Sequence, residues 1–163
     1  MDSLPKTSHD HHERIEAHVD RLPVLAGMIG RATPAELDAA FELEYGFVVG
    51  QLVPHMAAIE ATLYGELERL MERRHSMAPM RAEHEQLRRL VDALGEYRVR
   101  VAGGNLGRED EIGLRRVLYR LYSLLKVHLA EEELYLGVLD HNLSTEEKAV
   151  LARGIDHAGA EPL

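Results

Sequence analysis

The chain has 163 residues, of which 45% are apolar, so a single domain with a buried core is expected. Its 28 acidic residues outnumber 19 basic ones, and the formal net charge of -9 argues against binding to nucleic acid or to an anionic membrane. The absence of cysteine excludes disulfides, zinc-thiolate sites and iron-sulfur clusters, so any metal must be bound through nitrogen and oxygen. No apolar run approaches the roughly 20 residues of a membrane-spanning helix, and we expect a soluble, cytoplasmic protein.

Breaks containing glycine or proline divide the sequence into four long helical segments, and no stretch alternates as a strand would. The second segment opens with a capping signal, in which Thr33 precedes Pro34 and Glu36 stands three residues after the threonine. Ser144 and Glu147 repeat this spacing and predict a short fifth helix before a frayed C-terminal tail. The predicted long helices cover residues 9–29, 34–73, 79–101 and 108–141.

These segments predict an all-α fold, an up-down-up-down four-helix bundle with a short extra helix at the C-terminus. The bundle would occupy residues 9–141. Residues 1–8 would form an N-terminal tail, and residues 142–163 the short helix and the C-terminal tail.

The fourth long segment places a histidine and a glutamate on its apolar seam. Leucines recur there every three or four positions, and His128 and Glu132 take two positions of the same series. A glutamate is rarely buried without a partner, because placing its charge in a medium of low dielectric constant costs several kcal/mol. The sequence therefore predicts a compensating group beside Glu132.

Each of the other three helices also carries a histidine on its apolar face, namely His12, His55 and His84. His12 and His84 are 72 residues apart, and His55 and His128 are 73 apart, which is typical of an internal repeat of two helical hairpins. Because a helix rises about 1.5 Å per residue, antiparallel packing brings these four histidines to nearly the same level.

Histidine nitrogens and glutamate oxygens from facing helices are the ligands that di-iron and di-manganese bundles use. Residues four apart on a helix are rotated by only about 40°, so His128 and Glu132 can reach the same metal pair. The pattern therefore favours a metal site in the core.

With these motifs the chain resembles the hemerythrin-like family of HHE cation-binding domains, over approximately residues 9–141. The resemblance implies two iron ions that are bridged by an oxo or hydroxo group and by carboxylates. It also implies chemistry with a small oxidant, which would be dioxygen, peroxide or nitric oxide. The segments that carry it are DHHERI with His12, LVPHMAAIEATLY with His55, AEHEQL with His84, and HLAEEELYLGVLD with His128 and Glu132.

The second helix departs from the family pattern. The family usually has a glutamate four residues after the histidine of this helix, whereas here that position is Ile59 and the glutamate is Glu60. A step of five residues rotates a side chain by about 140° on a regular helix, which would turn Glu60 away from the site. Because the apolar pattern gains one residue here, we predict a π-bulge between His55 and Glu60 that turns Glu60 inward as a ligand.

The third helix also departs, because oxygen-carrying hemerythrins have two histidines four apart there, whereas Met80 and Arg88 flank His84 at that spacing. With fewer imidazoles, peroxide, nitric oxide or redox chemistry is expected rather than reversible oxygen carriage. The predicted metal ligands are His12, His55, Glu60, His84, His128 and Glu132.

Several alternatives remain at this point. His9 or His11 could replace His12, because the start of the first helix is not fixed by the sequence. His128 and Glu132 could form a hydrogen-bonded pair without a metal. His18 lies about 9 Å further along the helix than His12, so a supporting or core role is expected for it.

The resulting hypothesis is a non-haem di-iron protein that binds or reacts with a small oxidant in an oxidative-stress response or in sensing. Whether it is an enzyme is left open; an enzyme would be a peroxide- or oxygen-reactive oxidoreductase. The alternatives are iron buffering without catalysis and a metal-independent helical interaction module. The small oxidant is the expected partner, and the protein would be a monomer or a homodimer.

Overall fold

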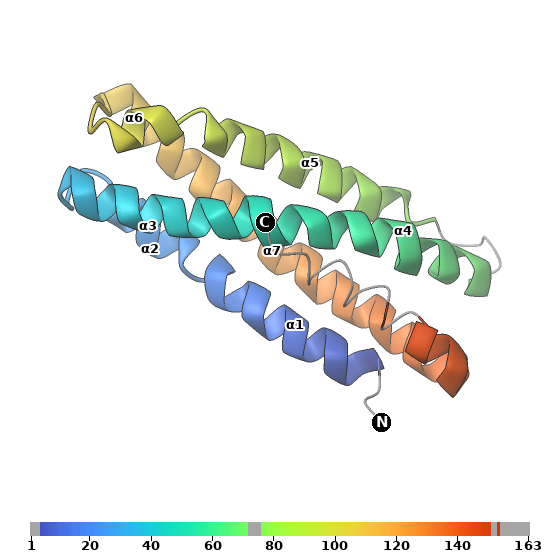
Figure 1. Cartoon of the computed structure of the whole chain (residues 1–163). Helices are drawn as coiled ribbons and strands as arrows, with labels where there is room; N and C mark the ends of the chain where they lie inside the picture. Colours follow the sequence, from blue (N-terminus) through green and yellow to red (C-terminus); the bar gives the residue numbers. More distant parts are fainter. Residues whose placement is uncertain (1–3, 72–75, 151–152, 154–163) are drawn as a thin grey trace.

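The computed structural model of the protein describes residues 4–71, 76–150 and 153, with side chains from residue 12 onward. These residues form helices arranged as four rods, each antiparallel to the next along the chain (Figure 1), and they contain no strand. The expected all-α bundle is confirmed. The first rod is α1 (Leu4–Val19) with α2 (Leu22–Met28); the second is α3 (Pro34–Phe47), a π-helical turn η1 (Val48–Leu52) and α4 (Val53–Leu70); the third is α5 (Ala78–Gly95) with α6 (Arg98–Ala102); the fourth is α7 (Arg108–Asn142).

Both predicted capping boxes are present. The Thr33 hydroxyl accepts a hydrogen bond from the Glu36 amide, and the Glu36 carboxylate accepts one from the Thr33 amide. Ser144 and Glu147 exchange the same pair of hydrogen bonds, and residues 145–150 are helical. Both helix starts are confirmed, because capping depends only on residues three apart in the chain.

The first and third rods are each divided into two helices, whereas a single helix was predicted for each. The first rod begins at Leu4 rather than residue 9, and it breaks between Val19 and Leu22. Pro23 explains this break, because proline has no N–H and its ring would clash with the carbonyl of Val19 four residues earlier. The third rod breaks after Gly95, whereas α7 matches its predicted range to within one residue.

The predicted π-bulge between His55 and Glu60 is wrong in its position. The π-helical turn lies upstream, at Val48–Leu52, and the amide of Val53 donates to the carbonyl of Val48 five residues earlier. α4 is then regular through Ile59 and Glu60. Pro54 accounts for this placement, because it cannot donate a hydrogen bond in a regular helix, and the widened turn before it absorbs the extra residue.

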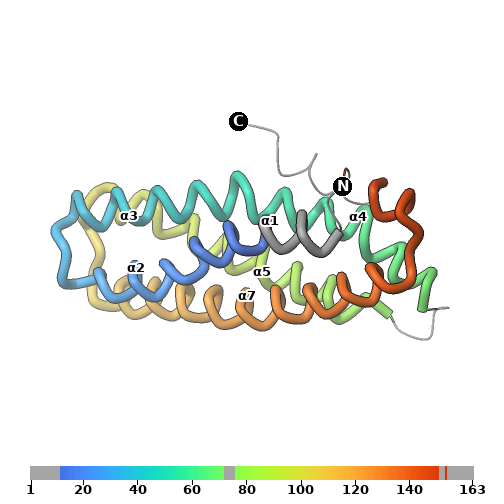
Figure 2. Tube along the Cα trace, turned by 90° about the horizontal axis from the view of Figure 1, so that it is seen from below, coloured from blue at the N-terminus to red at the C-terminus, as the bar shows by residue number. Residues whose placement is uncertain are grey.

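The core consists of two apolar clusters that follow one another along the bundle. On α7 the larger cluster extends to Leu129 and the smaller one begins at Leu136, so Glu132 lies between them. On α5 His84 lies between Met80 of the smaller cluster and Leu87 of the larger one. Figure 2 shows the four rods side by side along the length of the bundle, with α7 continuous from end to end. None of the described helices is both long and apolar enough to cross a membrane.

Candidate metal centre

A layer of polar side chains separates the two apolar clusters, and it contains five of the six predicted ligands. Each rod contributes one histidine to this histidine layer, and α7 also contributes Glu132. Their side chains are almost fully buried, with relative exposures of 5% or less. The members of the layer are His12 on α1, His55 on α4, His84 on α5, and His128 and Glu132 on α7.

His12, His55 and Glu132 form one group within this layer. The Nε2 atoms of His12 and His55 lie 3.2 and 3.5 Å from Oε2 of Glu132. One ligand atom from each of the three residues lies within 4.8 Å of the others, so that a single metal ion could be held among them. The predicted convergence of a histidine from the first rod, a histidine from the second and the glutamate of the fourth is therefore present.

His84 and His128 form the other group, and their Nε2 atoms lie 2.8 Å apart. The hydroxyl of Tyr64 lies 3.2 Å from Nε2 of His84. Imidazole nitrogens bind a metal such as zinc at about 2.1 Å, so two nitrogens at right angles around one ion lie about 3 Å apart. The separation between the two nitrogens is therefore compatible with two ligands of one metal ion.

The outward-facing nitrogens of these two histidines are each bound to a carboxylate. Nδ1 of His84 donates to Oε1 of Glu60 over 2.7 Å, and Nδ1 of His128 donates to Oε2 of Glu83 over 2.8 Å. Arg88 donates to the same Oε1 of Glu60 over 2.7 Å. Burial alone would raise the pKa of Glu60, but Arg88 and His84 lower it below its ordinary value, so the carboxylate stays ionised.

These carboxylates fix the tautomers of His84 and His128. Burial, together with the neighbouring His128, lowers the pKa of His84 to about 4, so this imidazole is neutral at pH 7. A neutral imidazole that donates from Nδ1 carries a lone pair on Nε2, which is the atom that binds metals. The Nε2 atoms of His84 and His128 lie 2.8 Å apart, and this contact is favourable when a proton or a metal ion lies between the two nitrogens.

The first group shows the same need for a cation. Within the described residues, Nε2 of His12 and both oxygens of Glu132 are buried and have no hydrogen-bond partner. Nε2 of His12 lies 3.2 Å from Oε2 of Glu132, but the two atoms form an ion-pair contact without a hydrogen bond. Burial alone would raise the pKa of Glu132, but His12 and His55 hold it below its ordinary value, so the buried carboxylate is ionised. A bound metal ion would supply the missing partner for these atoms, and imidazole with carboxylate suits iron, manganese or zinc.

Glu60 lies outside the two groups of facing ligand atoms. Its side chain is 26% exposed, and its carboxylate contacts Nδ1 of His84, on the far side of the imidazole from Nε2. Because α4 is regular here, Ile59 rather than Glu60 faces the core, where it is fully buried.

The structure also identifies site residues that the sequence analysis missed. Glu83, which directly precedes His84 in the chain, binds a histidine of a different helix, and Tyr64 reaches His84 from two turns beyond His55. Sequence spacing within one helix does not reveal either contact, because both depend on how α5 packs against its neighbours. The side chains of His9 and His11 lie outside the described residues.

His18 belongs to a separate polar pair, in agreement with the supporting or core role expected for it. Its Nδ1 lies 2.9 Å from Oε2 of Glu44, and its ring stacks on Phe47 with the centroids 4.1 Å apart. Arg21 lies 3.6 Å from the other oxygen of Glu44. The charge of the buried Glu44 is therefore compensated by His18 and Arg21, without any residue of the histidine layer.

The fold and the site together define an antiparallel helical bundle with histidines and a carboxylate gathered in its core. The chain belongs to the hemerythrin family, because the model of the hemerythrin HHE cation binding domain matches residues 5–139. The family resemblance inferred from the motifs is thereby confirmed, and cation binding is the property that the family brings to this site. Comparison with curated proteins and with solved structures found no match.

Proposed function

We propose that the protein is a non-haem di-iron protein that binds or reacts with a small oxidant, namely dioxygen, peroxide or nitric oxide. The observation that supports this most directly is the carboxylate of Glu132, which is buried within 3.5 Å of imidazole nitrogens of His12 and His55 and has no hydrogen-bond partner among the described residues. Such a group is costly in a protein core unless a cation compensates it. The choice of iron over manganese or zinc rests on the family, because these ligands suit all three metals.

In this proposal each group of histidines holds one metal ion. His12 and His55 would hold the first with Oε2 of Glu132, and His84 and His128 would hold the second. Oε1 of Glu132 forms no hydrogen bond within the described residues, so this oxygen could also serve as a metal ligand.

The remaining residues of the site would orient the ligands and exclude water. Glu83 and Glu60 fix the imidazoles of His128 and His84 through their Nδ1 atoms, which sets the direction of both lone pairs. The apolar clusters on either side of the histidine layer keep the site dry. Bound iron would supply the redox chemistry toward the small oxidant. We also propose a cytoplasmic location, which the cysteine-free sequence permits.

The test is elemental analysis by mass spectrometry of tag-free protein reconstituted with iron, together with its visible absorption spectrum. We expect two irons per chain in the wild-type protein and a loss of at least half of this iron in Glu132→Ala. Glu133→Ala, which changes an exposed neighbour on the same helix, is the matched control and should keep both irons. A folded wild-type protein that retains no iron would contradict the proposal.

Catalysis and sensing are separated by one further measurement on the same samples. A peroxide-consuming enzyme would turn over added peroxide many times per iron pair and lose this activity in His128→Ala. A sensor would react about once per site and then change its state without further turnover. Both remain within the proposed function, since the same histidine layer serves either role.

A further inference from the structure

We propose that Tyr64 is a metal ligand, whose phenolate oxygen completes the group formed by His84 and His128. This inference rests on the proposed function, because it requires a metal ion between these two histidines. It names a donor that the histidine and glutamate motifs of the sequence do not include.

The position of Tyr64 is that of a ligand rather than of a packing residue alone. The side chain is fully buried, and its ring stacks on the imidazole of His84 with the centroids 5.4 Å apart. Its hydroxyl oxygen lies 3.2 Å from Nε2 of His84, which in turn lies 2.8 Å from Nε2 of His128. Three donor atoms from three helices therefore converge, at separations close to the roughly 3 Å expected for neighbouring ligands of one ion.

A metal ion at His84 would leave the Tyr64 hydroxyl without its present partner. Because Nδ1 of His84 donates to Glu60, Nε2 is an acceptor and the phenol O–H donates to it. The same lone pair cannot accept this hydrogen bond and bind a metal. A buried hydroxyl that loses the acceptor it has among the described residues is unfavourable, and coordination through its oxygen removes this cost.

Among the described residues, two positions beside His84 that could carry a ligand are occupied by apolar side chains. Ile59 is fully buried at the position where the family usually has a glutamate, and Met80 is buried one turn before His84. Both belong to the smaller apolar cluster, as does Tyr64 itself. Tyr64 is thus the oxygen donor that α4 offers to the metal of His84 and His128.

Binding of Tyr64 as a phenolate also accounts for the proton of its hydroxyl group. Coordination forms the oxygen–metal bond, breaks the O–H bond and releases one proton to solvent.

The experiment compares wild-type protein, Tyr64→Phe and Tyr122→Phe, each reconstituted with ferrous iron and oxidised in air. Iron per chain is measured first, then visible absorption and resonance Raman scattering excited in the visible band. We expect a phenolate-to-iron absorption band in the wild type, with tyrosine ring vibrations in its Raman spectrum. Tyr64→Phe should retain iron at His12 and His55 but lose this band. Tyr122→Phe should keep the band, because Tyr122 is a half-buried tyrosine of α7 that lies outside the histidine layer.

The outcomes separate this inference from the proposed function. Two irons in the wild type without a phenolate band would overturn the role of Tyr64 and leave the di-iron proposal intact. Persistence of the band in Tyr64→Phe would do the same. Absence of iron from folded wild-type protein would overturn both. If Tyr64→Phe fails to fold, wild-type protein with ring-deuterated tyrosine decides, because a tyrosine ligand shifts the Raman bands and no shift overturns the inference.

A different observation concerns the outer surface of α7, where we infer a docking site for a second copy of the same chain. Large apolar side chains are exposed there in a single stripe, which we call the α7 face. All lie within about 100° of one another around the helix. Its members are Ile112, 48% exposed, Tyr119, 48%, Val127, 54%, Leu134, 74%, and Val138, 40%, with Ser123 between Tyr119 and Val127.

Four of the five apolar members of the α7 face are placed symmetrically about Ser123, so this part of the face fits itself in an antiparallel arrangement. Tyr119 and Val127 each lie four residues from Ser123, and Ile112 and Leu134 each lie eleven residues from it. A two-fold axis at Ser123 would place Tyr119 of one copy against Val127 of the other, and Ile112 against Leu134. A surface that pairs with itself in this way is what a two-fold homodimer requires.

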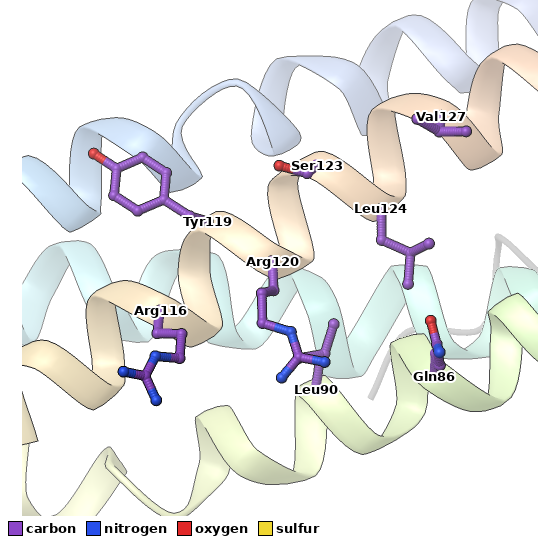
Figure 3. A pocket seen from close by; sticks show the side chains of 8 residues that line it. All are labelled: Gln86, Leu90, Arg116, Tyr119, Arg120, Ser123, Leu124 and Val127. Atoms are coloured by element: carbon purple, nitrogen blue, oxygen red, sulfur yellow. The ribbon is translucent and has the colours of Figure 1, made fainter.

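Charges beside the stripe support the same orientation. Arg116 and Arg120 lie in the half of the face before Ser123, and Glu131 lies in the half after it. The two arginines reach toward α5 over a shallow groove of about 510 Å³ (Figure 3), next to Tyr119 and Val127. An antiparallel pair would bring the arginines of each copy near the glutamate of the other, whereas a parallel pair would oppose like charges.

The test is the oligomeric state of full-length protein by sedimentation velocity over a range of concentrations. We expect a dimer whose dissociation constant rises roughly tenfold or more in Val127→Arg, while Val24→Arg, at an exposed valine on α2, leaves it unchanged. Arg116→Glu should weaken the dimer, and combination with Glu131→Arg should restore it. A monomer at all concentrations, or a dimer insensitive to Val127→Arg, would overturn this inference.

Discussion

The histidines of the layer depend on residues that never touch the metal site directly. Glu83 and Glu60 each accept a hydrogen bond from the outward nitrogen of a histidine on another helix. Such partners set both the tautomer and the direction of the lone pair that faces a metal. We therefore expect them to control metal affinity while leaving the helical fold unchanged, because both carboxylates lie at the surface of the core.

Glu83→Ala is expected to weaken metal binding by roughly 10- to 100-fold, the usual cost of losing such a partner. The reason is that His128 loses the acceptor of its Nδ1–H and can turn its ring or change its tautomer. Competition with a chelator of known affinity measures the effect. Glu85→Ala is the matched control on α5, since Glu85 faces solvent and pairs with Arg89 instead. Equal affinities in the two variants would contradict the orienting role.

Glu60→Gln distinguishes a ligand from an orienting residue. Glutamine keeps an oxygen that can accept from Nδ1 of His84, so an orienting Glu60 predicts two irons per chain with modestly weaker binding. A ligand Glu60 predicts the loss of about half of the iron. Elemental analysis at saturating iron decides between them, and retention of both irons is the outcome we expect from the contact with Arg88 and His84.

At the scale of the helices, the sequence predicts what depends on local spacing. The capping boxes at Thr33 and Ser144 and nearly the whole of α7 are confirmed, because caps and an unbroken apolar seam are set within a few residues. His12, His55, His84, His128 and Glu132 converge as expected, because the heights of residues on antiparallel helices follow from counting.

The errors arise where two local signals compete. The apolar pattern around His55 indicates one extra residue, and the departure from the family motif at Ile59 predicts that this residue lies after the histidine. The structure places it before the histidine because Pro54 cannot join a regular hydrogen-bond ladder. Glu83 and Tyr64 were missed for another reason, since their contacts with His128 and His84 depend on the packing of separate helices.

The π-helical turn can be tested by removing its extra residue. Deletion of Gly50 converts Val48–Leu52 toward a regular helical turn and preserves the faces on both sides of it. Pro54 would then clash with a carbonyl four residues earlier, at a cost of about 3 kcal/mol. We expect chemical denaturation to show this loss in the deletion variant and most of the stability restored when Pro54→Ala is added. Equal loss in both variants would mean that Pro54 is not what holds the turn.

At the scale of the whole molecule, the histidine layer lies between two apolar clusters that do not need a metal to form. The bundle should therefore remain helical when the metal is removed, with its stability reduced rather than abolished. A ligand that binds only the folded state stabilises it by about 2.7 kcal/mol when free ligand is present at about 100 times its dissociation constant. In a domain of this size, about 1 kcal/mol corresponds to roughly 2–4 °C in Tm.

Removal of the metal with a chelator is thus expected to lower Tm by roughly 5–10 °C. Circular dichroism should show an unchanged helical spectrum at low temperature and a lower midpoint on heating. His128→Ala, which removes a ligand of one ion but leaves both apolar clusters intact, should show a smaller change of Tm on adding chelator than the wild-type protein does. A wild-type midpoint that ignores both iron and chelator would instead favour a helical module that does not depend on metal. In that case the contacts with His12 and His55 would alone hold the pKa of Glu132 below its ordinary value, and the bundle would lose stability as pH falls and this buried carboxylate becomes protonated.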